Sequence, residues 1–176
     1  MSNYSLFFVE NGDEYLFSLS VAGNIFDHNT YKHIGGAFDD DIASISILKS
    51  LKGYLRFRIA YPESEEFCTM DVDACFKEAQ VQLPNDERHH FFCLNNCLML
   101  LYVFATSNLD TLLIHASVIK NDEQGFVFLG KSGTGKSTHS RLWLEHVESN
   151  ELLNDDNPVI RIIDSKAYVF GYAVEW

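Results

Sequence analysis

The residues with the most specific chemistry form a short glycine-rich segment, Gly130–Thr138, whose sequence is GKSGTGKST. Its spacing matches the pattern G-x-x-x-x-G-K-[ST], in which backbone N–H groups surround a phosphate group. Glycine suits such a loop because the absence of a Cβ lets successive N–H groups point toward an anion. The sequence therefore predicts a phosphate-binding loop (P-loop, or Walker A motif) made of Gly130, Lys131, Ser132, Gly133, Thr134, Gly135, Lys136, Ser137 and Thr138.

The residues on both sides of the loop suit this role. An apolar run of strand type, Gly125–Leu129, precedes it, and residues 136–147 predict a helix. The N-terminus of that helix would add unpaired N–H groups and the positive end of its dipole. Lys136 would place its charge on the β- and γ-phosphates of ATP, and the Ser137 hydroxyl would bind Mg²⁺. Thr138 is expected to pack on the first helical turn. A decayed or purely structural loop is the alternative.

Two acidic residues, Asp155 and Asp156, follow the apolar pair Leu152-Leu153 further along the chain. A strand that ends in carboxylates near a phosphate loop can bring one carboxylate to Mg²⁺ and the other to the hydroxyl that is phosphorylated. The alternative is an exposed turn, because the flanking asparagines and Pro158 are residues typical of turns. Beside an intact phosphate loop, the catalytic interpretation is favoured.

A single histidine, His115, lies within the nearly continuous apolar run 112–118. Such a histidine is most often a hydrogen-bonded core residue. Its place one strand ahead of the phosphate loop gives it a second interpretation, in which it faces the γ-phosphate. Both interpretations stay open at this point.

The order of these segments resembles the kinase domain of HPr kinase/phosphorylase. The segments are Ile114–Ala116, the phosphate loop and Leu152–Asp156. They are also similar to the nucleotide-binding domain of ATP-dependent phosphoenolpyruvate carboxykinase, which shares the Ser-Gly-Thr-Gly-Lys loop and the paired aspartates. The resemblance covers residues 111–176, whereas residues 1–84 resemble neither family.

The resemblance implies roles for the candidate residues. Ser137 and one of Asp155 and Asp156 would hold the divalent metal, and the other aspartate would act as general base. His115 matches a histidine that is a metal ligand in the carboxykinases and an active-site residue in the HPr kinases. Lys136 would hold the phosphates. The two families differ in which aspartate has which role, so the assignment stays open.

The function implied is ATP-dependent transfer of the γ-phosphate to a hydroxyl of a protein serine or a small molecule. One departure is that the chain ends at Trp176, before the further strands, helices and basic residues of both families. We therefore expect a truncated or reduced domain, and a non-catalytic module that binds nucleotide or a partner is the alternative. No phosphoenolpyruvate or oxaloacetate site can be located, so the carboxykinase reaction is the weaker interpretation.

The composition narrows the class of protein. The net charge of −12 argues against a nucleic-acid or anionic-membrane partner. The start of the chain lacks the features of a signal peptide, and the longest apolar stretch, Phe91–Ala105, is too short and too polar to span a bilayer. The four cysteines show no CxxC spacing, so reduced thiols and a cytoplasmic location are expected. The oligomeric state, including a homo-oligomer, is left open.

The pattern of apolar residues predicts an α/β protein. Together with the glycine-rich motif, the resemblance implies a phosphate-loop kinase domain with a mixed sheet (111–176), preceded by a small β-rich domain (1–84) and a buried linking helix (85–110). The expected strands are Tyr4–Val9 and Tyr15–Ser20 around an Asn11-Gly12-Asp13 hairpin turn, then 42–48, 54–60, 67–72, 74–83, 111–120, 125–129, 152–153, 158–163 and 167–172. A helix over 42–51 is an alternative. The linking helix should cover 86–107, with Asn85 or Asp86 as its N-cap.

Other clusters suit a structural role better. The acidic run Asp39–Asp41 is most simply a solvated turn, with cation binding as the alternative. His89, Cys93 and Cys97 are spaced to lie along one helix, but no second ligand pair completes a zinc site, and cysteine is commonly buried. The remaining histidines are expected at the surface: His28, His33, His90, His139 and His146.

Overall fold

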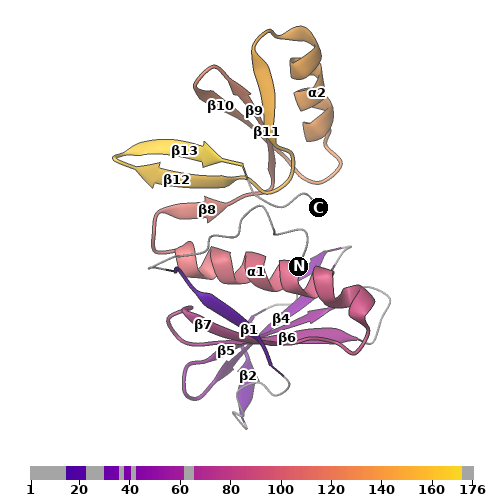
Figure 1. The fold of residues 1–176 in the computed structure, drawn as a ribbon, viewed down its shortest axis with the longest axis vertical. Helices are drawn as coiled ribbons and strands as arrows, with labels where there is room; N and C mark the ends of the chain where they lie inside the picture. The colour runs from indigo at the N-terminus through magenta and orange to yellow at the C-terminus, as the bar shows by residue number, and fades with distance from the viewer. Residues whose placement is uncertain (1–14, 23–29, 36–37, 41–42, 62–65, 172–176) are drawn as a thin grey trace. The chain divides into compact units, whose positions relative to one another are not determined.

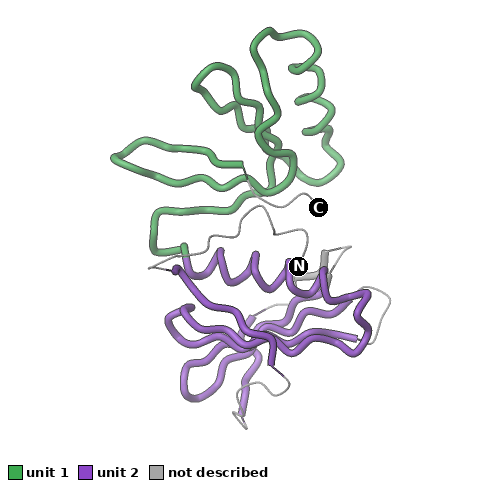
Figure 2. Tube along the Cα trace, in the orientation of Figure 1, with its two compact units in different colours: residues 1–12, 106–176 green, residues 13–105 purple. Residues whose placement is uncertain are grey.

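The computed structural model describes residues 15–22, 30–35, 38–40, 43–61 and 66–171. The chain divides into two compact units (Figure 2). The N-terminal unit contains residues 13–105, and the C-terminal unit contains residues 106–176. The described residues form an α/β structure that consists mostly of strands, with two α-helices and a mixed sheet. No helix within the described residues is long and apolar enough to cross a membrane.

The N-terminal unit is built on a seven-stranded sheet with the strand order β1-β7-β6-β5-β4-β2, and β3 also pairs with β4. The strands are β1 (Ser18–Val21), β2 (Tyr31–His33), β3 (Phe38–Asp40), β4 (Ala43–Ser50), β5 (Leu55–Ala60), β6 (Phe67–Val72) and β7 (Glu78–Gln82). The pair β1 and β7 is parallel, and the other pairs are antiparallel. Alternation along β5 buries Phe57 and Ile59, as expected for a strand with one face on a core.

One helix, α1 (His90–Thr106), covers a face of this sheet (Figure 1). A single 3₁₀ turn, η2 (Glu87–His89), precedes α1. Asp86 is the N-cap of this turn. The buried core joins the helix to β5, β6 and β7 through Phe57, Ile59, Cys68, Met70, Val72, Ala79, Val81, Cys93, Cys97 and Leu101. The helix expected to link the two halves is thus part of the core of the N-terminal unit.

A polar cluster ties β2, β5 and β6 together. The Asp71 carboxylate, which is fully buried, accepts two hydrogen bonds of 2.7 Å from the Arg56 guanidinium. The Tyr31 hydroxyl donates to the same carboxylate at 3.2 Å, and the guanidinium lies 4.0 Å from the Tyr31 ring centroid. Burial and the Asp71 charge raise the pKa of Tyr31 to about 12. These contacts supply the counter-charge that a buried carboxylate needs.

The C-terminal unit contains two three-stranded sheets, with the strand orders β10-β9-β11 and β13-β12-β8. Their strands are β8 (Thr111–Leu113), β9 (Ala116–Asn121), β10 (Gln124–Leu129), β11 (Asn150–Asn154), β12 (Val159–Ile163) and β13 (Lys166–Phe170). All pairs are antiparallel. The helix α2 (Lys136–His146) packs on the first of these sheets, where Trp143 contacts the Phe126 and Phe128 rings at centroid distances of 4.8 and 5.4 Å.

Some sequence expectations need correction. The apolar run 111–120 is not one strand, because the chain breaks at Ile114 and His115 and enters a second sheet. The break is fixed by hydrogen bonds from the Ile114 and Ala116 N–H groups to the carbonyls of Pro158 and Asp156. Residues 42–51 do not form the alternative helix; β4 occupies that region as a strand.

The region before β4 also differs from expectation. Asp39 and Asp40 belong to β3 and pair with Ser44 and Ala43, so this acidic run is not simply a loop. The strand β2 was not expected. The expected hairpin around Asn11–Asp13 lies outside the described residues. Elsewhere, strands lie close to the expected positions.

Candidate functional site

Sheet topology brings the three candidate segments to one edge of the β10-β9-β11 sheet. Both β10 and β11 run antiparallel to β9, so they are parallel to each other and end at the same edge (Figure 1). In the register, Leu129 pairs with Ala116, and Asn154 pairs with Val118. The glycine-rich loop leaves the end of β10, the aspartates follow β11, and His115 precedes β9. We call this set (Gly130–Thr138, His115, Asp155 and Asp156) the loop edge.

Two of the loop glycines have a conformation that other residues rarely adopt. The φ angles of Gly133 and Gly135 are 75° and 91°. A Cβ at either position would meet no atom within 4 Å, so glycine is needed there for its backbone freedom, not for space. Gly130 differs, because a Cβ there would lie 2.5 Å from the Thr134 hydroxyl oxygen.

The loop is held by internal hydrogen bonds. The Thr134 hydroxyl donates to the Lys131 carbonyl at 2.8 Å. The Lys136 ammonium donates to the Gly130 carbonyl at 3.0 Å and to the Lys131 carbonyl at 3.2 Å. Lys136 therefore folds back over the loop, where its charge lies beside the backbone that would surround an anion.

The helix α2 begins directly after the loop. Gly135 is its N-cap, and no side chain caps the first turn. The first turn also contains no acidic residue. Its N–H groups and dipole are thus available to an anion seated in the loop. Ser137, the second residue of the helix, is half-buried, whereas Thr138 is exposed and does not pack as expected.

His115 and Asp156 lie next to each other. Nδ1 of His115 is 3.4 Å from Oδ1 of Asp156, and their side chains are 51% and 39% exposed. Oδ2 of Asp156 accepts a hydrogen bond of 2.7 Å from the Asn157 amide. Burial raises the pKa of the Asp156 carboxyl, with a smaller contribution from Asp155, while His115 and Asn157 lower it. Asp155 itself is exposed.

The segment 154–157 also has the character of a turn. The Asn154 side-chain oxygen accepts a hydrogen bond of 2.9 Å from the Asp156 N–H group. This local contact is the one that makes asparagine common in turns. Turn chemistry and a carboxylate directed at His115 therefore coexist in this segment.

A buried pair of hydroxyls joins α2 to the sheet next to the loop edge. The sequence did not predict this pair. Ser117 in β9 and Ser140 in α2 are buried, and their oxygens lie 2.5 Å apart. This bond fixes α2 against the central strand of the sheet. The signal in the sequence was a serine within the apolar run that also contains His115. His139 is exposed, as expected, and its ring also contacts the Phe128 ring at a centroid distance of 4.6 Å.

The spacing of His89, Cys93 and Cys97 does not produce a zinc site. Cys93 and Cys97 face the core, where Sγ of Cys97 lies 3.9 Å from Sγ of Cys68. Contact with Cys68 and burial raise the pKa of Cys93, which keeps its thiol protonated. His89 points elsewhere, with its ring stacked on Tyr61 at 4.1 Å.

Comparisons with known proteins do not assign the chain to a family. No protein-family model, curated protein or solved structure matches it.

Proposed function

We propose that the loop edge binds ATP with Mg²⁺ and transfers the γ-phosphate to a hydroxyl. The observation that carries this proposal is topological. Three segments that are separate in the sequence meet at one edge of a sheet, and each has residue types that phosphate transfer needs. The resemblance to the kinase domain of HPr kinase/phosphorylase points to the same reaction.

The residues of the loop fit a polyphosphate. The glycine backbone and the uncapped N-terminus of α2 offer N–H donors, and Lys136 supplies a cation that now rests on two carbonyl oxygens. On binding, this ammonium would exchange those carbonyls for phosphate oxygens. Ser137 and one aspartate would hold Mg²⁺, which neutralises charge on the phosphates when bound.

We propose that Asp156 accepts the proton. Asp155 would then be the aspartate that binds Mg²⁺ together with Ser137. Asp156 is partly desolvated, its pKa is raised, and it faces His115. A carboxylate with a raised pKa is a better general base. His115 Nδ1 lies on the Oδ1 side of this group and Asn157 on the Oδ2 side, so the carboxylate is held between two neighbours while it accepts the proton from the hydroxyl.

Calorimetry of Mg²⁺-ATP binding tests the first half of this proposal. Lys136→Ala should weaken binding by about 1.5–3 kcal/mol, the typical loss of a hydrogen bond to a charged group. Arg141→Ala is a matched control, because Arg141 is an exposed cation further along α2. Equal affinity of the wild type and Lys136→Ala would overturn the proposal.

A nucleotide-binding module without catalysis is the second candidate. The turn contacts of Asn154 and the exposure of Asp155 favour it, because turn chemistry accounts for both without a reaction. This candidate predicts tight Mg²⁺-ATP binding in the wild type with no turnover, and Asp155→Asn and Asp156→Asn variants that bind equally well.

A further inference from the structure

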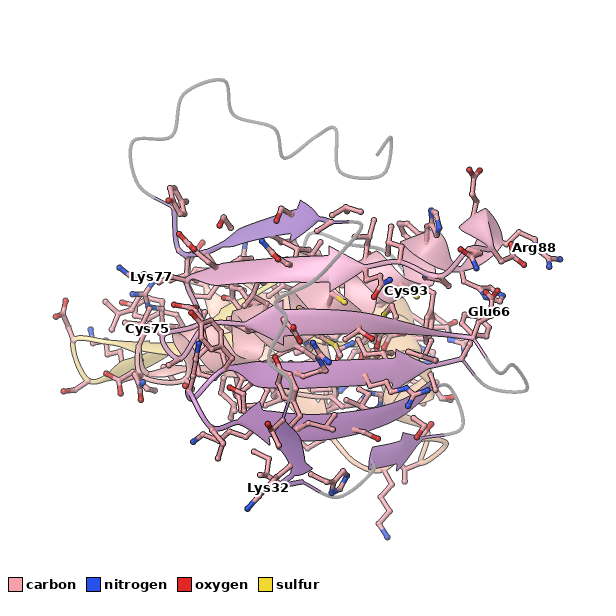
Figure 3. The ribbon with its side chains drawn as sticks, turned by 90° about the horizontal axis from the view of Figure 1, so that it is seen from below. Lys32, Glu66, Cys75, Lys77, Arg88 and Cys93 are labelled. Carbon is pink, nitrogen blue, oxygen red and sulfur yellow. The ribbon has the colours of Figure 1, made fainter. Side chains whose placement is uncertain are left out.

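A second group of possible ligands lies in the N-terminal unit, far along the chain from the glycine-rich loop. Glu66 precedes β6, and Asp86 and His89 follow β7. Because β6 and β7 are antiparallel, the start of one and the end of the other share an edge of the sheet. One ligand atom from each of Glu66, Asp86 and His89 lies within 4.8 Å of the other two. Figure 3 shows Glu66 at this edge with the neighbouring Arg88.

We propose that Glu66, Asp86 and His89 bind a divalent transition-metal ion of the Zn²⁺ type. One imidazole nitrogen and two carboxylate oxygens form a ligand set that favours such an ion over Ca²⁺ or Mg²⁺, because imidazole suits the borderline metals. Three protein ligands leave a coordination position open for water or a small ligand. In the part of the chain that the structure describes, no other three His, Cys, Asp or Glu ligand atoms come this close together.

The His89 imidazole is held in place for this role. Its ring stacks on Tyr61 with an interplanar angle of 13°. Its Nδ1 atom is buried and makes no hydrogen bond, although it lies 3.3 Å from Oε2 of Glu66. A buried nitrogen that faces a carboxylate without a hydrogen bond needs either a proton or a cation between the two groups. The cluster supplies further negative charge from Asp86, which favours a cation.

Asp86 is also anchored before any metal binds. Its Oδ1 atom accepts a hydrogen bond of 3.0 Å from the Arg88 N–H group, which fixes the carboxylate at the start of η2. The Arg88 guanidinium also donates hydrogen bonds to both oxygens of this carboxylate, and a metal would have to displace them, but the Arg88 side chain is 84% exposed. A solvent-exposed guanidinium can turn away at little cost, so Arg88 does not block the site.

A cavity of about 290 Å³ adjoins the cluster and gives access to it. Glu66 lines this cavity together with the polar side chains of Thr69, Gln82 and Asn85. The open coordination position can thus be reached from solvent, and a small ligand on the metal would meet hydrogen-bonding groups. The other lining residues are Phe67, Leu83 and Pro84.

Titration of the reduced, chelator-treated full chain with Co²⁺, without nucleotide, tests the proposal. A Cys75→Ser background removes the exposed thiol. We expect one equivalent of Co²⁺ with visible d–d absorption, no thiolate charge-transfer band, and displacement by Zn²⁺. Glu66→Gln, which preserves volume, and His89→Gln should each weaken binding at least about tenfold, because even loss of an outer-shell partner costs that much.

A control and a second readout make the test independent of folding defects. Glu87→Gln changes an exposed carboxylate of the same turn outside the cluster and should bind as the parent does. Zn²⁺ should raise the unfolding temperature of the parent but not of Glu66→Gln. Absence of stoichiometric uptake, or equal uptake by Glu66→Gln, would overturn the proposal and leave Glu66 and His89 as a simple side-chain contact.

Discussion

The two units of this chain differ in how deeply they bury their residues. In the N-terminal unit, one helix and a seven-stranded sheet enclose a core in which Phe57, Met70 and Val81 are fully buried. In the C-terminal unit, six strands are shared between two small sheets, and many apolar side chains, such as Leu112 and Leu129, remain exposed. The glycine-rich loop belongs to this second unit, which has the smaller buried core.

This difference suggests a division of stability. Segments that bind and release ligands tend to come from the less stable parts of a protein, where few buried contacts oppose local opening. We therefore expect amide protons of β5, β6 and β7 to exchange more slowly than those of β9, β10 and β11. Mg²⁺-ATP should reduce this difference in amide exchange rate, because a ligand stabilises the unit to which it binds.

The largest expected effect comes from the core of the N-terminal unit. Phe57 is fully buried, and its ring lies 5.3 Å from that of Phe104 in α1. Phe57→Ala should lower the free energy of unfolding by about 3–5 kcal/mol, because it removes buried contacts and leaves a cavity. The comparable change in the C-terminal unit, Phe170→Ala at a 45% exposed position, should cost less than about 1 kcal/mol. Chemical denaturation of both variants measures the contrast, and equal losses would remove the proposed difference between the units.

A smaller effect is expected from the buried hydroxyl pair that joins α2 to β9. Ser117→Ala leaves the Ser140 hydroxyl buried without this partner and should cost about 1–3 kcal/mol. Replacing both serines by alanine should be less harmful than the two single changes added together, because no unsatisfied hydroxyl is left. A double-mutant cycle in the unfolding free energy measures this coupling. Additive losses would show that the pair does not hold the helix.

The smallest effect concerns the protonation of Asp156. Its pKa is raised above the ordinary 3.8 by burial, and the Asn157 amide opposes the shift. Because the folded state favours the protonated form, Asp156 contributes stability below the ordinary pKa and loses that contribution as the pH rises through the folded value. Asn157→Ala should raise the pKa further. A carboxyl titration followed by ¹³C NMR measures it, and an unchanged or lower pKa would contradict this account of Asp156.

Local patterns predicted much of the fold. Alternating apolar residues indicated β5 and β6, and the strand, glycine loop and helix around Gly130–Thr138 occur as expected. The prediction of one strand over 111–120 was wrong, because a continuous apolar pattern does not reveal that β8 and β9 belong to different sheets. The short strand β2 carries Lys32 and His33, so its composition gave no strand signal.

The two candidate sites also differ in how far the sequence could predict them. The members of the loop edge could be named from the sequence because a motif and paired acids have local signatures, and the structure places them at one edge of the sheet. The Glu66, Asp86 and His89 cluster could not, because its members meet only through the pairing of β6 with β7. The sequence spacing puts His89 on one helix with Cys93 and Cys97, whereas in the structure the His89 ring stacks on Tyr61 and is directed away from them.

The most direct test of the central claim is single-turnover transfer of the γ-phosphate of Mg²⁺-ATP to water, which takes the place of the acceptor hydroxyl, measured for the wild type and Asp156→Asn. If Asp156 accepts the proton, the variant should bind nucleotide with similar affinity but react about 10²–10⁴ times more slowly. Glu151→Gln is the control, because Glu151 lies at the other end of β11 and pairs with Lys120. Equal rates for wild type and Asp156→Asn, or tight binding without turnover in the wild type, would contradict a phosphotransfer site at the loop edge.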